Sequence, residues 1–227
     1  MPRSTPEPTV RVPVWDRAVR IVHWLLAALI GLAWWTAEEE MVEWHDRIGM
    51  TILGLLIFRL VWGFIGSSTA RFASFVRGPA GILAYLRGRS GYVLGHNPLG
   101  ALSLLALLAA VGLQVGLGLF AADEDGFLAG PLNGFVSEDM AETLTDLHKD
   151  VFDWLLVLIG LHVAAIAFYL LVKRDNLVGP MFSGRRPAPE GTEPMAAAPA
   201  WRALVAASIA FAAVSAIWYA GGAGGAG

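Results

Sequence analysis

Apolar residues gather in five long stretches along the chain, and shorter polar segments separate them. The stretches cover approximately residues 21–37, 48–65, 99–121, 151–172 and 203–220. A helix needs about 20 mostly apolar residues to cross the hydrocarbon core of a bilayer, and all five stretches meet or nearly meet that length. The pattern therefore predicts an all-α membrane protein with five transmembrane helices.

The composition agrees with a membrane protein and excludes several kinds of active site. Of the 227 residues, 56% are hydrophobic and only 15% are charged, and the mean hydropathy is +0.58. A soluble domain usually has about 25% charged residues. Because the chain contains no cysteine, it has no disulfide framework, thiolate zinc site, iron–sulfur cluster or cysteine nucleophile. The net charge of −3 gives no indication of nucleic-acid binding.

Charge alternates between the segments that connect the apolar stretches. Residues 1–20, 66–98 and 173–199 contain twelve of the sixteen lysines and arginines. Residues 38–47 and 122–149 together contain twelve acids and two bases. Basic connecting segments face the cytoplasm in most membrane proteins. This pattern predicts a cytoplasmic N-terminus, five crossings and a C-terminus on the outer side.

The chain divides into five parts on this basis. Residues 1–20 form a cytoplasmic N-terminal segment, and residues 21–178 form a core of four helices. Residues 179–202 are rich in Pro and Ala and are expected to be a cytoplasmic linker. Residues 203–220 form an accessory fifth helix, and residues 221–227 are expected to be a disordered tail.

Four of the five histidines fall into two pairs according to their depth in the membrane. His23 lies near the cytoplasmic end of the first helix, and His45 lies at the outer start of the second. His148 and His162 are 14 residues apart, which is close to four helical turns, so they share one helix face. At 1.5 Å per residue they lie about 21 Å apart along the helix. His45 is therefore expected to pair with His148 near the outer surface, and His23 with His162 near the cytoplasmic surface.

Two imidazole pairs stacked across a membrane suit two haem groups with six-coordinate iron. Imidazole is a common axial ligand of haem iron, and two such ligands favour electron transfer over oxygen binding. Haem b needs no covalent link to cysteine, and the chain has none. Zinc is a poorer candidate, because its ligands lie close together and these pairs are separated by most of the membrane. The alternative is that the histidines only pack helices, as in a membrane anchor subunit.

Three further polar residues lie in or beside the predicted helices. Arg59 lies 14 residues after His45 on the same helix face, where a haem propionate would offset its charge; alternatively, its side chain extends to the membrane interface. His96 precedes the third helix and is either a solvated residue or a contact to a propionate or quinone. Gln114 is an amide within the third helix and is expected to bond a neighbouring helix.

Several stretches of the chain resemble motifs of the prokaryotic cytochrome b561 family, which includes the b-type cytochrome subunits of nickel–iron hydrogenases. The resemblance covers nearly all of residues 12–186 in order. It implies a four-helix transmembrane di-haem bundle in which the four paired histidines bind iron and Arg59 contacts a propionate. The predicted fifth helix lies outside the shared core. The similar stretches are VWDRAVRIVHW (14–24), WHDRIGMTILGLLIFRLVWGFIG (44–66), ARFASF (70–75), GHNPLGALS (95–103) and LHKDVFDWLLVLIGLHVAAIAFYLLVKRDNLVGPM (147–181).

The resemblance implies a cytochrome of a bacterial inner membrane, with two haem b groups and ubiquinone or menaquinone as substrate. Family members serve hydrogenases, exchange electrons with c-type cytochromes or oxidise superoxide. The acidic outer segments would repel superoxide and attract a cationic protein, which favours a periplasmic c-type cytochrome as partner. We therefore expect electron transfer between quinone and such a partner. The alternatives are a superoxide-oxidising quinone reductase, a subunit of a hydrogenase-type complex and a non-redox anchor.

Overall fold

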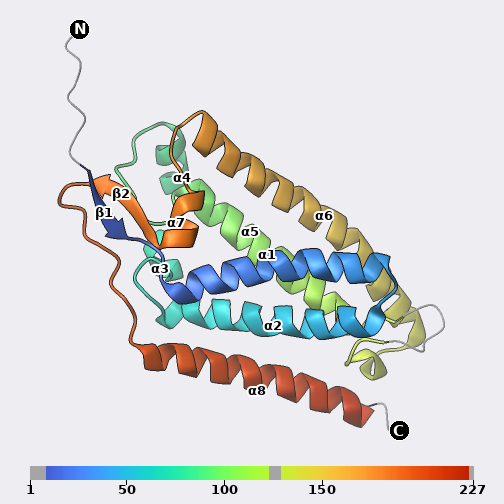
Figure 1. The fold of residues 1–227 in the computed structure, drawn as a ribbon. Helices are drawn as coiled ribbons and strands as arrows, with labels where there is room; N and C mark the ends of the chain where they lie inside the picture. The colour runs from blue at the N-terminus through green and yellow to red at the C-terminus, as the bar shows by residue number, and fades with distance from the viewer. Residues whose placement is uncertain (1–8, 123–128, 225–227) are drawn as a thin grey trace.

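The computed structural model describes residues 9–122 and 129–224, and its architecture is dominated by five long helices (Figure 1). All five are long and apolar enough to cross a membrane, which confirms the predicted fold class. The long helices are α1 (Arg17–Glu38), α2 (Val42–Ile65), α5 (Pro98–Gly118), α6 (Glu138–Leu171) and α8 (Ala200–Gly224). The short elements are β1 (Thr9–Pro13), α3 (Phe72–Phe75), α4 (Pro79–Leu86), η1 (Asn133–Phe135), α7 (Val178–Ser183) and β2 (Arg185–Pro189).

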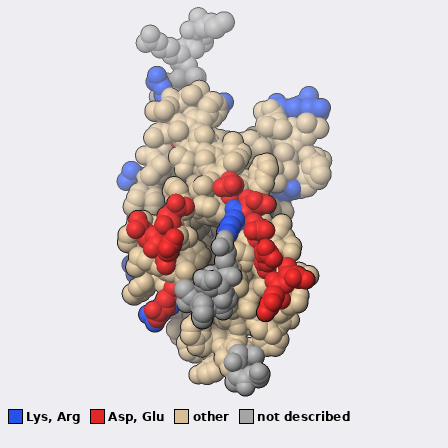
Figure 2. Space-filling view, turned by 90° about the vertical axis from the view of Figure 1, so that its right-hand side faces the viewer, with Lys and Arg blue, Asp and Glu red and all other residues tan. Residues whose placement is uncertain are grey.

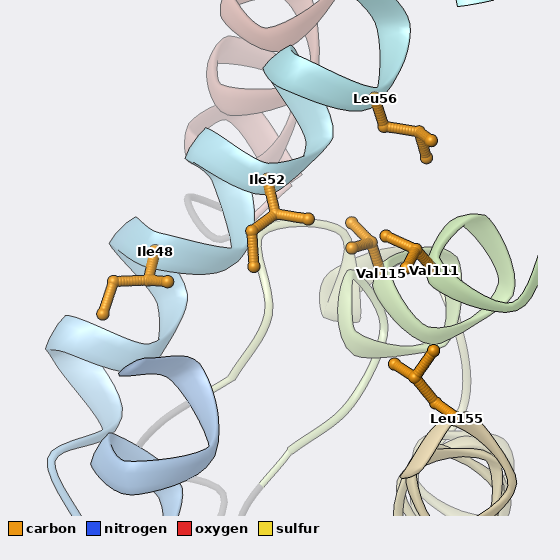
Figure 3. Packing of buried hydrophobic residues seen from close by; sticks show 6 residues of the cluster. All are labelled: Ile48, Ile52, Leu56, Val111, Val115 and Leu155. Atoms are coloured by element: carbon orange, nitrogen blue, oxygen red, sulfur yellow. The ribbon is translucent and has the colours of Figure 1, made fainter. Parts of the chain in front are cut away.

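Helix α2 is the centre of the bundle. It packs against α1, α5 and α8, while α5 and α6 form a second closely packed pair. Buried aliphatic side chains join α2, α5 and α6 in one cluster, which Figure 3 shows from close by. Because α8 lies along α2 and not along α6, the accessory helix covers the core from one side only (Figure 1). The cluster consists of Ile48, Ile52, Leu56, Val111, Val115 and Leu155.

The two ends of the bundle differ in charge. We call the end where α1 and α5 finish and α2 and α6 begin the acidic end, and the opposite end the basic end. Carboxylates of residues 38–46 and 138–153 gather on the acidic end, as Figure 2 shows. Part of the predicted acidic segment, Asp123, Glu124 and Asp125, lies outside the described residues.

Helix α6 begins much earlier than its apolar stretch predicts. Its first residue is Glu138, not 151, so 13 polar or mixed residues precede the predicted span. The Ser137 side chain accepts a hydrogen bond from the backbone N–H of Met140, and Glu138 and Asp139 occupy the first turn. A capping serine and first-turn acids both favour a helix start. Every other end of a long helix lies within six residues of its predicted position.

The predicted linker contains regular structure. Strand β2 pairs antiparallel with β1, from Thr9 opposite Pro189 to Pro13 opposite Arg185. Helix α7 precedes β2, and the backbone N–H of Val14 donates to the carbonyl of Gly184 at 2.8 Å. The sequence did not predict this sheet, because each strand has only five residues and two of the five residues in β2 are proline.

The predicted disordered tail is helical at its beginning. Residues 221–224 continue α8, and residues 225–227 lie outside the described residues. A Cβ atom on Gly221 would overlap the carbonyl oxygen of Pro131, so the helix backbone lies directly against the segment that precedes η1. This close contact supports the last turn of α8 where composition alone predicts disorder.

Asp16 fixes the start of α1 against the end of α2. Its Oδ1 accepts a hydrogen bond from the backbone N–H of Val19 at 2.8 Å and caps α1. Its Oδ2 accepts from the indole N–H of Trp62 at 3.0 Å and from the hydroxyl of Ser67. One carboxylate therefore holds two segments together and sets the position of His23, two turns into α1.

We expect Asp16→Asn to lower the thermal stability of the full-length protein in detergent. The amide keeps one acceptor for the helix cap but leaves Trp62 or Ser67 without its partner. An unsatisfied buried donor costs about 1–3 kcal/mol. Asp146→Asn is the matched control, because Asp146 is exposed. Equal unfolding temperatures for the two variants would contradict this role of Asp16.

Candidate functional site

Two pairs of histidine rings face each other at opposite ends of the bundle. At the acidic end, His45 of α2 and His148 of α6 have ring centroids 6.0 Å apart. At the basic end, His23 of α1 and His162 of α6 have ring centroids 6.5 Å apart. The structure thus brings together both pairs expected from depth in the membrane, and α6 contributes one histidine to each.

The separation of the rings fits an iron or similar ion held between them. An imidazole nitrogen lies about 2 Å from a first-row metal ion that it ligates, and the ring centre lies about 1 Å farther away. Two axial imidazoles therefore have ring centres about 6 Å apart, close to both observed distances. Within the described residues, no three His, Asp or Glu side chains gather to hold a metal ion. A donor set of two imidazoles suits an ion whose other ligands come from a macrocycle, as in haem.

Backbone carbonyls orient both histidines of the acidic end. Nδ1 of His45 lies 2.9 Å from the carbonyl oxygen of Ala33, and Nδ1 of His148 lies 2.9 Å from that of Gln114. A carbonyl only accepts, so each Nδ1 carries the proton and each Nε2 keeps its lone pair. This is the usual outer hydrogen bond of a metal-binding histidine, which fixes the tautomer and the ring orientation.

Gln114 contacts the same histidine through its side chain. Its Nε2 lies 3.1 Å from Nε2 of His148, which confirms the expected bond between the amide and a neighbouring helix. The amide therefore donates to the nitrogen that a metal ion would use. Its Oε1 is buried and has no hydrogen-bond partner in the described part of the chain.

A cavity of about 470 Å³ adjoins His45 and His148 between α1, α2, α5 and α6. Cofactor pockets have volumes of about 300–1,000 Å³ and mostly apolar walls. Ile52, Val111 and Leu155 line this cavity, so one wall is the aliphatic cluster of Figure 3. An apolar space with two convergent imidazoles has the chemistry that a porphyrin requires.

Glycine makes room for the ring of His148. A Cβ atom on Gly118 of α5 would lie 2.9 Å from Cε1 of that ring, closer than real Cβ contacts. Gly49 lines the cavity, and a Cβ on it would meet nothing within 4 Å. Glycine residues on α2 and α5 therefore line the cavity beside the two histidines.

Arg59 carries a buried positive charge at the basic end. Its side chain lies on α2, only 4% of the residue is exposed, and its guanidinium carbon lies 5.3 Å from the ring centre of Phe72. The alternative in which Arg59 extends to the interface is therefore wrong. Neither Nη1 nor Nη2 has a hydrogen-bond partner among the described residues. A buried guanidinium requires an anion, so this site fits an acidic group from outside the chain.

His96 lies half-buried in an aromatic slot. Its ring centroid is 4.6 Å from that of Trp15 and 4.7 Å from that of Phe75, and its Nδ1 is buried without a partner in the described residues. Burial, and after it the positive charge of Arg59, lower the pKa of His96 to about 3. The expectation of a solvated residue was wrong, because the slot is built by residues distant in the sequence.

His162 has a weaker outer contact than the acidic-end histidines. Its Nδ1 lies 3.3 Å from the hydroxyl of Ser103 on α5. The backbone carbonyl of Gln114 and the hydroxyl of Ser103 show that this helix orients both histidines of α6, although it contributes no histidine itself.

A family model described as prokaryotic cytochrome b561 matches residues 14–184. The match includes all five histidines and Arg59, and it ends before α8. No curated protein and no solved structure matches the chain.

We expect Gly118→Val to displace His148 and weaken binding of any haem at the acidic end. The added side chain would occupy the space of the imidazole ring. Gly116→Val is the control on the same helix, because a Cβ on Gly116 meets nothing within 4 Å. The measurement is the haem content and absorption spectrum of the purified proteins. Equal haem content in the two variants would contradict the packing role of Gly118.

Proposed function

Because the chain belongs to the prokaryotic cytochrome b561 family of membrane b-type cytochromes in electron transfer, we propose that it carries electrons between a membrane quinone and a periplasmic redox protein. Two haem b groups serve as the electron carriers in this proposal. The family membership, the five apolar helices and the facing imidazoles support it together.

Four histidines hold the two haem groups. His45 and His148 bind the iron of one haem, and His23 and His162 bind that of the other. The observation that carries this assignment is the facing of two imidazole pairs with ring centres 6.0 Å and 6.5 Å apart. When bound, each haem supplies an iron that accepts and releases one electron. The backbone carbonyls of Ala33 and Gln114 and the side chain of Ser103 orient the imidazoles.

The basic end faces the cytoplasm in this proposal, and the membrane is a bacterial inner membrane. The alternation of charged segments supports that orientation through the positive-inside rule. Both α2 and α6 carry a candidate site residue near each end, so the two haems lie near opposite membrane surfaces. Haems held by the two histidine pairs would give electrons a path across the membrane interior.

The acidic end is the docking surface for the periplasmic partner. Carboxylates gather there around the mouth of the bundle (Figure 2). Such a surface attracts a cationic protein, such as a c-type cytochrome, by long-range steering. It repels superoxide, which is an anion, so the charge argues against superoxide oxidation as the main activity.

Single substitutions of the histidines test the two sites. We expect His45→Ala and His148→Ala to remove one and the same haem, and His23→Ala and His162→Ala to remove the other. Loss of either histidine of a pair would leave its haem with a single protein ligand and would weaken its binding. Haem content and reduced-minus-oxidised spectra of the four variants provide the measurement. Loss of the same haem from His23→Ala and His148→Ala would contradict the pairing.

Ionic strength tests the docking surface. We expect the rate of electron exchange with a cationic c-type cytochrome to fall roughly tenfold or more between low and high salt, as for other electrostatically steered pairs. Glu39→Gln combined with Glu142→Gln should reduce the rate at low salt. The control is Glu190→Gln combined with Glu193→Gln, which removes two exposed acids that follow β2. A rate that is indifferent to salt and equal in the two double variants would argue against this partner.

A further inference from the structure

We propose that His96 joins Arg59 in binding a carboxylate at the basic end, namely a propionate of the haem held by His23 and His162. This inference rests on the proposed function, because it adds a binding residue to one of its two haem sites. The structure gives three independent reasons for it.

The first reason is that two side chains have buried nitrogen atoms without partners. Nη1 and Nη2 of Arg59 and Nδ1 of His96 are buried and make no hydrogen bond within residues 9–122 and 129–224. A buried polar group without a partner is unfavourable, and a buried unpaired charge is more so. Both side chains therefore fit an acceptor that comes from outside the chain.

The second reason is that the two side chains lie in the same region of the basic end. Arg59 contacts the ring of Phe72, Phe72 contacts Phe75, and Phe75 contacts His96. The charge of Arg59 and the imidazoles of His162 and His23 all act on His96. The candidate anion site and the candidate iron ligands of the basic end thus lie together.

The third reason is that two carboxylates at the basic end already have other partners. Asp16 is the carboxylate whose charge acts on Arg59, but its oxygens accept from Val19, Trp62 and Ser67. Asp175 is held by Arg186, with both oxygens 3.0 Å from Nη2. A neutral quinone would not offset a buried guanidinium, whereas a haem propionate carries the required charge.

The surrounding residues hold His96 in place. Its ring lies between Trp15 and Phe75, and the next residue, Asn97, caps α5 by accepting from the backbone N–H of Gly100 at 2.8 Å. Asn97 also donates through Nδ2 to the hydroxyl of Tyr169 at 3.0 Å. The imidazole is therefore anchored to α5 and α6 before any ligand binds. A side chain that is already fixed loses little conformational entropy when a ligand binds.

The test compares His96→Phe with His96→Gln in the full-length purified protein. Phenylalanine keeps an aromatic ring in the slot but removes the donor, whereas glutamine keeps a donor but removes the ring. We expect His96→Phe to lower the midpoint potential of the basic-end haem, because the propionate charge is then less well offset. We expect His96→Gln to remain close to wild type. The potential of the acidic-end haem should not change in either variant.

Spectroelectrochemical titration measures both potentials, and His162→Ala identifies which signal belongs to the basic-end haem. Resonance Raman spectra provide a second readout, because the propionate bending band should shift in His96→Phe alone. If His96 only fills the aromatic slot, His96→Gln will be perturbed and His96→Phe will not. That result would overturn the proposal.

Combination with Arg59→Gln gives a further test. If both side chains hold one propionate, the double variant should shift the potential by less than the sum of the single shifts, since the two residues share a partner. Additive shifts would contradict a shared carboxylate. A wild-type protein without a basic-end haem would overturn this proposal and the proposed function together. Normal haem content with an unchanged potential in His96→Phe would overturn this proposal alone.

Discussion

Two pairs of imidazoles facing each other across the bundle interior are the feature on which the proposed cofactor sites depend. Ring centres about 6 Å apart leave space for a metal ion but not for direct contact between the rings. Each pair has to be held open at that separation, and helix packing provides the support. Helix α2 is fixed by α1, α5 and α8, and α6 is fixed along α5. The two histidines of each pair therefore project from helices that are held apart by their packing against other helices.

The supports of the two ends differ. At the acidic end, backbone carbonyls orient the rings, and a cavity lined by aliphatic side chains adjoins them. At the basic end, buried nitrogen groups of Arg59 and His96 remain without partners among the described residues. The two sites therefore place a bound cofactor in different electrostatic environments. Such a difference tunes reduction potential, because charge and hydrogen bonding around a haem set it.

The sequence predicted those features that depend on periodicity and spacing. Five apolar stretches gave five helices, and the 14-residue separation of His148 and His162 placed them on one face of α6. The polar beginning of α6 was not predicted. The length of an apolar stretch marks only the part of a helix that can cross a membrane, and it does not show polar turns that precede this part and begin at a capping residue. The aromatic slot of His96 and the bonds of Asp16 were also missed. Both combine residues from distant segments, and a single sequence does not show which distant segments meet.

The central claim is that this chain holds two haem groups, each between two imidazoles. The most direct test is the haem-to-protein ratio of the purified full-length protein, measured from the pyridine haemochrome spectrum and the protein concentration. The account predicts two haem b groups for each chain. A ratio that stays at one haem or none after the protein has been supplied with excess haem would contradict it.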